Sequence, residues 1–207
     1  SFVENPVKFF FEKQLGVYFR DEDDRIEESE NFTLNGLEHY RISNELLHLE
    51  EAQFNDYFAK QRVKGIMPRG EFAEVCEQDI RADVLAFKEK IKDYSLPHSE
   101  SVDFVVETAQ GNIRLFGYME PLFGDENQII EWRFAKYKDR YRIRPWLYYL
   151  IQLATKENAL PPRIIAKDKD LTLKTIEKST ALEKLKMYVE AYLQSQQQIQ
   201  LIPTENI

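Results

Sequence analysis

Three charged side chains in the middle of the chain have the types and spacing of a metal-dependent hydrolase site. They are Glu120, at the end of one predicted strand, and Glu131 and Arg133 on the next. Residues two apart on a strand share a face, so Glu131 and Arg133 point the same way. In a hydrolytic nuclease such carboxylates hold Mg²⁺, and a nearby lysine orients or deprotonates the attacking water. Arginine is a poor substitute because it keeps its proton. On spacing alone, the favoured interpretation is therefore surface charges of modest energetic worth.

A run of cations follows this group. It comprises Arg133, Lys136, Lys138, Arg140, Arg142 and Arg144, with Tyr137, Tyr141 and Trp146 interleaved. Such a run could contact a phosphate backbone and stack on bases. It could equally be a solvated loop, or it could meet the acidic surface of a partner protein. The sequence leaves these three interpretations open.

The composition limits what the whole chain can do. Its 207 residues, 43% of them apolar, are enough for one globular domain or for one with a small helical addition. The formal net charge of −8 argues against a freestanding nucleic-acid binder, because neutralisation of phosphates by Lys and Arg dominates such binding. The first residues already look folded, which is typical of a piece of a longer protein.

Several classes of protein lack support in the sequence. No phosphate-binding glycine loop, dinucleotide-binding motif or hydrolase nucleophile motif is present. The three histidines share no metal-binding spacing, and the single cysteine rules out an internal disulfide. We find neither a leader nor a run of 18 apolar residues. We therefore expect a soluble cytoplasmic protein with no cofactor, no metal, no membrane contact and no small-molecule substrate.

The first half of the chain is predicted to be helical. We expect a short helix over residues 5–16, an acidic loop over 21–30 and a helical stretch over 37–62. A longer helix over 70–94 carries an apolar stripe with three- and four-residue spacing, formed by Phe72, Cys76, Ile80, Val84, Phe87 and Ile91. The stripe predicts that Cys76 is a buried, unreactive thiol.

The second half changes to alternating apolar residues, which is typical of strands. Residues 102–106 and 113–119 form a predicted hairpin around a turn at 110–112. A second turn at 121–127 and a strand over 128–134 complete an antiparallel three-stranded meander. Further on we expect a helix from Pro145 to about Lys156, which leaves the cations as a loop. Two short strands over 164–166 and 171–173 and a last helix over 180–197, with Leu182 and Tyr192 on its apolar face, follow.

Three segments of the sequence resemble a known family. The residues Asn-Pro-Val-Lys-Phe-Phe-Phe-Glu-Lys-Gln-Leu-Gly at 5–16, Phe-Thr-Leu-Asn-Gly-Leu at 32–37 and Met-Pro-Arg-Gly-Glu-Phe-Ala-Glu at 67–74 occur in this order. Together they are similar to successive signatures of the RecC C-terminal domain. No one of them is diagnostic alone, but three in order are specific.

The resemblance implies a restriction-endonuclease-like core related to the RecB nuclease domain, with a degenerate active site. Active relatives carry Gly-x-x-Asp on one strand and Asp-x-Lys on the next. Here these places match Gly-Tyr-Met-Glu at 117–120 and Glu-Trp-Arg at 131–133. A glutamine and a tyrosine on the following helix of active relatives correspond loosely to Arg144 and Tyr148. The lysine is missing and both acids are one methylene longer, so we expect no cleavage, although weak metal binding stays open.

The resemblance also implies partners and a process. A RecC C-terminal domain would dock RecD, work beside RecB in exodeoxyribonuclease V, and lie near the fork where duplex DNA is split for double-strand break repair. The predicted fold class is α+β. We expect an N-terminal helical segment (1–66) that packs on a degenerate nuclease-like domain (67–207), the two forming one structural unit.

The proposed DNA contacts are Arg133, Lys136, Lys138, Arg140, Arg142 and Arg144. Two alternatives stay open. One is a divergent active Mg²⁺-dependent nuclease that uses Glu120 and Glu131, and the other is a purely protein-binding scaffold without DNA contact.

Overall fold

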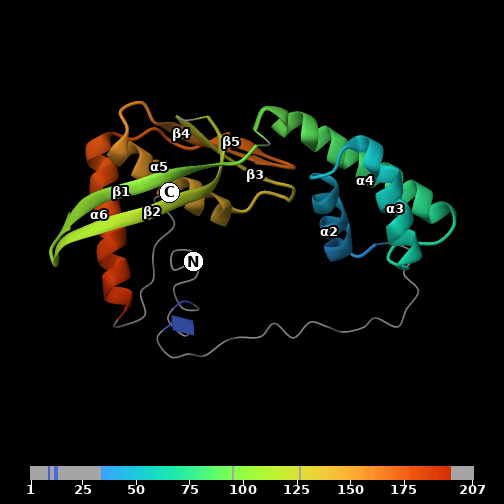
Figure 1. The fold of residues 1–207 in the computed structure, drawn as a ribbon, viewed down its shortest axis with the longest axis horizontal. Coiled ribbons are helices and arrows are strands. Elements are labelled where there is room, and N and C mark those ends of the chain that lie inside the picture. Colours follow the sequence, from blue (N-terminus) through green and yellow to red (C-terminus); the bar gives the residue numbers. More distant parts are fainter. Residues whose placement is uncertain (1–8, 10–11, 14–33, 95, 126, 197–207) are drawn as a thin grey trace.

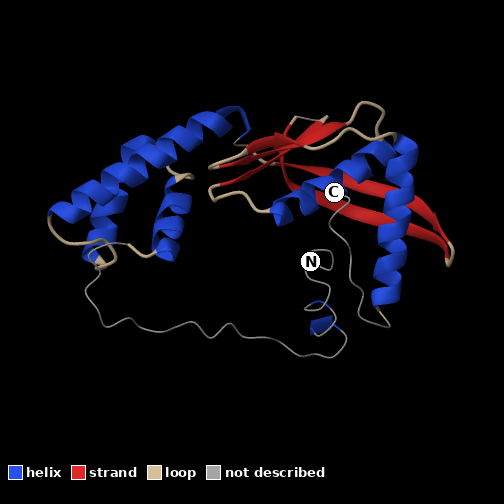
Figure 2. Cartoon of the chain, turned by 180° about the vertical axis from the view of Figure 1, so that it is seen from behind, coloured by secondary structure: helices blue, strands red, loops and turns tan. Residues whose placement is uncertain are grey.

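The chain combines a helical part with a mixed sheet. A computed structural model describes residues 9, 12–13, 34–94, 96–125 and 127–196. Three helices gather at one end, and a five-stranded sheet with two further helices forms the other (Figures 1 and 2). The predicted α+β class is therefore confirmed. The predicted acidic loop at 21–30 and nearly all of the predicted helix at 5–16 lie outside the described residues. Among the described helices, none is long and apolar enough to cross a membrane.

The helical part begins with two helices where one stretch was predicted. Helix α2 (Gly36–Leu46) and helix α3 (Phe54–Val63) are separated by a bend and a short 3₁₀ turn, η1 (Glu51–Gln53). The prediction of one continuous stretch was wrong because the chain carries two helix-start signals. Asn35 and Glu38 form a capping box at the start of α2, and Glu50 and Gln53 form another before α3.

Helix α4 (Glu71–Ile91) continues as the 3₁₀ turn η2 (Lys92–Tyr94), so the long predicted helix is confirmed. Its buried side chains are Ala73, Ile80, Val84, Phe87 and Ile91. Two residues of the predicted stripe differ. Phe72 is 60% exposed and Cys76 is half-buried, and the buried residue in the first turn of the helix is Ala73 instead of Phe72. Burial, together with nearby Asp79 and Glu77, still raises the pKa of the Cys76 thiol, which keeps its thiolate scarce.

The sheet has the strand order β1-β2-β3-β4-β5. Strands β1 (His98–Thr108), β2 (Gly111–Gly124) and β3 (Gln128–Arg133) form the predicted antiparallel meander. Strand β2 runs through part of the predicted second turn, up to Gly124. There φ is +102°, and a Cβ would lie 2.2 Å from the Gln128 carbonyl oxygen, so the turn requires glycine.

Two further strands extend the meander. Strand β4 (Leu160–Ala166) pairs with β3 in parallel, and β5 (Asp170–Thr172) pairs with β4 antiparallel. The sequence predicted both strands but not their place beside β3. The parallel pairing has a consequence for function, because the chain leaves β3 and β4 at the same edge of the sheet.

Helix α5 (Ile143–Thr155) connects β3 to β4 and starts two residues before the predicted start at Pro145. A proline is tolerated there because the first-turn N–H groups have no partner within the helix. Residues 139–142 form a 3₁₀ turn, η3 (Asp139–Arg142), so the predicted loop is partly helical and Arg144 belongs to α5.

Helix α6 (Lys178–Ser195) packs against α5. Their shared core contains Trp146, Tyr149 and Leu150 of α5 and Leu185 of α6, with Ile164 of β4 beneath them. The predicted last helix is confirmed, but Leu182 and Tyr192 are more than 40% exposed instead of lying on its buried face. The face that is buried carries Ala181, Leu185, Tyr188 and Val189.

Strand β3 divides its side chains between two hydrophobic cores. Ile130 and Trp132 face α4, where the Phe87 ring contacts Trp132 and Phe134, at 5.3 Å between the Phe87 and Phe134 centroids. Ile129 packs with strand residues beneath α5. Because side chains alternate along a strand, Glu131 and Arg133 share the α5 face with Ile129. The division of the chain at residues 66 and 67 stays a prediction.

Candidate functional site

The carboxylate of Glu131 lies between two arginines. Glu131 is only 3% exposed although it is charged. Its Oε1 accepts a hydrogen bond of 2.9 Å from Nε of Arg133. Its Oε2 accepts two from Arg144, 2.7 Å from Nη2 and 3.2 Å from Nε. Both carboxylate oxygens are therefore occupied by guanidinium donors.

The elements around Glu131 explain how the two arginines reach it. Arg133 lies two residues further along β3 and so points to the same face. Arg144 lies in the first turn of α5, the helix that covers this face. The early start of α5 thus brings Arg144 to the strand, which a loop conformation would not have fixed.

The two arginines on Glu131 are hard to replace by a metal ion for electrostatic reasons. A buried carboxylate costs several kcal/mol unless it is paired and hydrogen-bonded. The side chains of Arg133 and Arg144 are 45% and 33% exposed, so both cations reach water while Glu131 does not. Guanidinium groups do not lose their charge, and Arg144 uses two N–H groups on one oxygen. A divalent cation at Glu131 would have to displace these donors and bear the repulsion of both charges.

The other predicted acid lies apart from this cluster. Glu120 is exposed and makes no hydrogen bond or ion pair with any residue that the structure describes. In the described ranges, no three His, Cys, Asp or Glu side chains gather closely enough to hold a metal ion. Tyr148, the loosely matched tyrosine, is half-buried and packs against the Met119, Leu122 and Ile129 cluster.

A second polar cluster, which lies beneath α5, was not predicted from the sequence. Glu100 of β1 accepts a hydrogen bond of 3.1 Å from Gln152 and forms an ion pair of 2.9 Å with Lys156. Gln152 is fully buried. The signal that could have found it is a glutamine on the buried face of an otherwise apolar helix, since a buried amide needs a hydrogen-bonding partner.

The predicted basic run separates into two groups. Arg133 and Arg144 bind Glu131, and Arg142 pairs with Asp139 at 3.3 Å. Lys136, Lys138 and Arg140 are exposed, and none of them has an ion-pair partner within the described part of the chain. Trp146 is 3% exposed in the core under α5 and is not accessible to a base.

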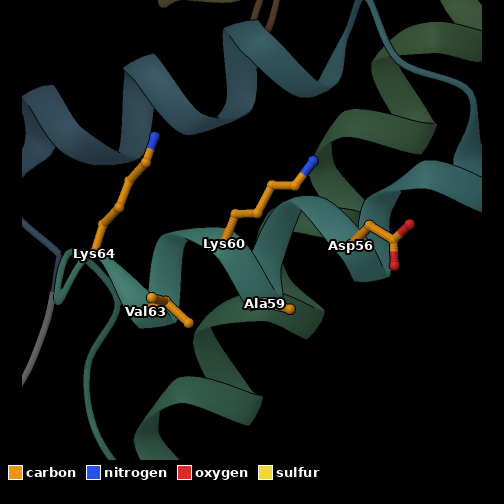
Figure 3. A pocket seen from close by; sticks show the side chains of 5 residues that line it. All are labelled: Asp56, Ala59, Lys60, Val63 and Lys64. Carbon is orange, nitrogen blue, oxygen red and sulfur yellow. The ribbon is translucent and has the colours of Figure 1, made fainter.

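A hollow of about 440 Å³ lies elsewhere, on the helical part. The described residues that line it are Asp56, Ala59, Lys60, Val63 and Lys64, all on α3 or directly after it. Figure 3 shows Lys60 and Lys64 extending to the same side of this helix. The hollow is lined by none of the residues that the sequence predicted for chemistry, so the Glu131 cluster is the stronger candidate site.

Fold and site together define an α+β domain that has acids on the second and third strands of a meander, one of them neutralised by arginine. The sequence model of the RecC C-terminal domain matches residues 1–206. The chain therefore belongs to the RecC C-terminal domain family.

Its relatives are much longer proteins. The chain is 58% identical to the RecBCD enzyme subunit RecC of Haemophilus influenzae, over 99% of the chain and 19% of the relative. It is 25% identical to the subunit of the same name in Escherichia coli, over 92% of the chain and 17% of the relative. The chain thus spans about a fifth of the length of these relatives.

The geometry predicts that Glu131 stabilises the fold and that Glu120 does not. Glu131→Gln leaves two cations facing each other, and we expect the free energy of unfolding to fall by about 2 kcal/mol. This is less than for a fully buried pair because both arginines reach water. The matched variant Glu120→Gln should change stability by less than about 0.5 kcal/mol. Urea unfolding followed by circular dichroism measures both, and equal losses would contradict the assignment.

Proposed function

We propose that this chain is a non-catalytic domain of a RecC subunit, in which an arginine pair has replaced the metal of a nuclease. The observation that carries the proposal is the occupation of both Glu131 oxygens by hydrogen bonds from Arg133 and Arg144. A nuclease needs that carboxylate open to Mg²⁺ and a lysine near the attacking water. Neither requirement fits a carboxylate held by two permanently charged guanidinium groups.

The proposed core is restriction-endonuclease-like. Its support is the element order α4, β1, β2, β3, α5, β4, with an antiparallel meander followed by a helix that returns the chain to a strand parallel to β3. The degenerate acids fall on β2 and β3, and α5 carries Arg144 against them. The division into an N-terminal helical segment (1–66) and a nuclease-like domain (67–207) is proposed as part of the same arrangement.

The family supplies the proposed context. Its named relatives are RecBCD enzyme subunits. We therefore propose that the chain works in the cytoplasm within a helicase–nuclease of double-strand break repair. Its proposed partners are RecD, which it would dock, and RecB, with DNA near the fork. The proposed DNA contacts are the cations of the basic run that are not bound to acids.

The two alternatives have less support. A divergent nuclease would use Glu120 and Glu131, but one is exposed and the other is enclosed by guanidinium groups. A purely protein-binding scaffold would need the basic run to be neutralised by acids. Three of its members are bound to acids, whereas Lys136, Lys138 and Arg140 have no such partner among the described residues.

The first prediction from this proposal concerns catalysis. We expect no digestion of linear duplex or single-stranded DNA in Mg²⁺ or Mn²⁺, because the metal position is occupied. A Glu120→Gln, Glu131→Gln double variant, purified in parallel, controls for contaminating nucleases. Digestion by the wild-type chain that the double variant lacks would show that the site is active.

The second prediction concerns the partner. Immobilised chain should retain purified RecD, and a variant that lacks the exposed cations, Lys136→Gln, Lys138→Gln and Arg140→Gln, should retain it equally. Size-exclusion chromatography of the mixture gives an independent readout. Failure of wild-type chain to retain RecD in both assays would reject the docking proposal and leave the proposal on catalysis standing.

A further inference from the structure

Two loops far apart in the sequence lie together at one edge of the sheet. Residues 134–142 follow β3 and residues 167–169 follow β4, and these strands are parallel. The Lys167 amide donates to the Ala135 carbonyl at 3.0 Å, and the Tyr137 amide donates to Asp168 Oδ1 at 2.7 Å. The loops are therefore fixed to each other and present one surface.

This two-loop surface adds Lys169 to the exposed cations of the basic run that have no acidic partner in the described part of the chain. Its exposed cations are Lys136, Lys138, Arg140 and Lys169, and in the described part of the chain no carboxylate pairs with any of them. Lys167 is different, because Asp83 of α4 neutralises it at 2.5 Å. The acids of the surface are also engaged, since Asp139 pairs with Arg142 and Asp168 accepts the Tyr137 amide.

Tyrosine rings lie beneath the cations. Lys169 Nζ lies 4.2 Å from the centroid of the Tyr137 ring. The Arg140 and Arg133 guanidinium carbons lie 5.7 and 5.6 Å from the centroid of Tyr141. Both rings are partly buried against the core shared by α5 and α6. Rings that are anchored in the core and already in contact with cations are poor platforms for stacked bases, but they hold cations in place.

The surface lacks what a protein interface needs at its centre. Specific protein interfaces have a buried apolar core, formed by aromatic and aliphatic side chains. None of the exposed large apolar side chains of the described residues lies in 134–142 or 167–169. Phosphate recognition, by contrast, needs only cations and hydrogen-bond donors held in register.

We propose that the two loops form one binding surface for the sugar–phosphate backbone of a nucleic acid. Lys136, Lys138, Arg140 and Lys169 are its phosphate ligands, and Tyr137 and Tyr141 are positioning residues. Arg133 and Arg144 serve Glu131 instead. The inference rests on the proposed function, which it deepens by naming the surface and its ligand. It implies binding that depends on salt and is indifferent to base identity.

The test measures binding of fluorescent oligonucleotides to the full 207-residue chain by anisotropy at several low salt concentrations. The quadruple variant Lys136→Gln, Lys138→Gln, Arg140→Gln, Lys169→Gln should weaken binding and reduce the slope of log K against log salt by about 3. The control variant Lys60→Gln, Lys64→Gln, Lys174→Gln, Lys186→Gln has the same net charge and should keep the wild-type slope. Equal slopes in the two variants, or no wild-type binding at low salt, would overturn the proposal.

A pair of tyrosine variants tests the positioning role. Tyr141→Leu should weaken binding roughly two- to fivefold, because Arg140 loses its contact with the face of the tyrosine ring. Tyr141→Phe keeps the ring and should restore wild-type binding. If Tyr141→Phe is as weak as Tyr141→Leu, the ring does not position the cations. Circular dichroism establishes that both variants are folded.

Two further ligands, measured in the same binding assay, identify what the surface recognises. Oligonucleotides with abasic sites should bind as tightly as intact ones, and a strong preference for intact bases would contradict backbone recognition. Polyglutamate of equal charge should bind more weakly than the oligonucleotide. If it binds as tightly and loses affinity in the quadruple variant, the surface recognises an acidic protein instead. The nuclease and RecD assays are unaffected by these outcomes, so failure here would remove the proposed DNA contact and leave the proposals on catalysis and RecD docking standing.

Discussion

The structure depends on one electrostatic constraint: a carboxylate buried under a helix must be neutralised. Glu131 is held inside by the strand alternation that also buries Ile129 and Ile130, so it cannot turn to water without shifting β3. Neutralisation by a metal ion would leave the site open to substrate and water. Neutralisation by Arg133 and Arg144 fills it with side chains that cannot dissociate. In our proposal this exchange converts a catalytic position into a structural one.

The need to neutralise Glu131 also positions the elements around the site. Arg144 fixes the start of α5 against β3, and α5 then returns the chain to β4 parallel to β3. The parallel pair brings two loops to one edge, where they share hydrogen bonds. The proposed phosphate-binding surface is therefore a consequence of the topology around Glu131. The cations of this surface lie beside Glu131 and its two arginines, but they do not pair with Glu131.

Much of this could be predicted from the sequence, because the informative patterns are local. Alternation predicted the meander, and two-residue spacing placed Glu131 and Arg133 on one face. Contacts between distant segments could not be predicted in this way. The bond from Arg144 to Glu131 requires α5 to start before its proline, and the contact of Lys169 with Tyr137 requires β4 beside β3. Neither arrangement produces a periodic pattern in the sequence.

In our proposal, Arg133 and Arg144 exclude a divalent cation from Glu131. Binding of Mn²⁺, followed by electron paramagnetic resonance in the wild-type chain and in the Glu131→Gln and Glu120→Gln variants, tests it most directly. We expect the three proteins to bind Mn²⁺ alike, because Glu131 does not contribute a ligand. A stoichiometric Mn²⁺ site in the wild-type chain that Glu131→Gln abolishes would contradict it.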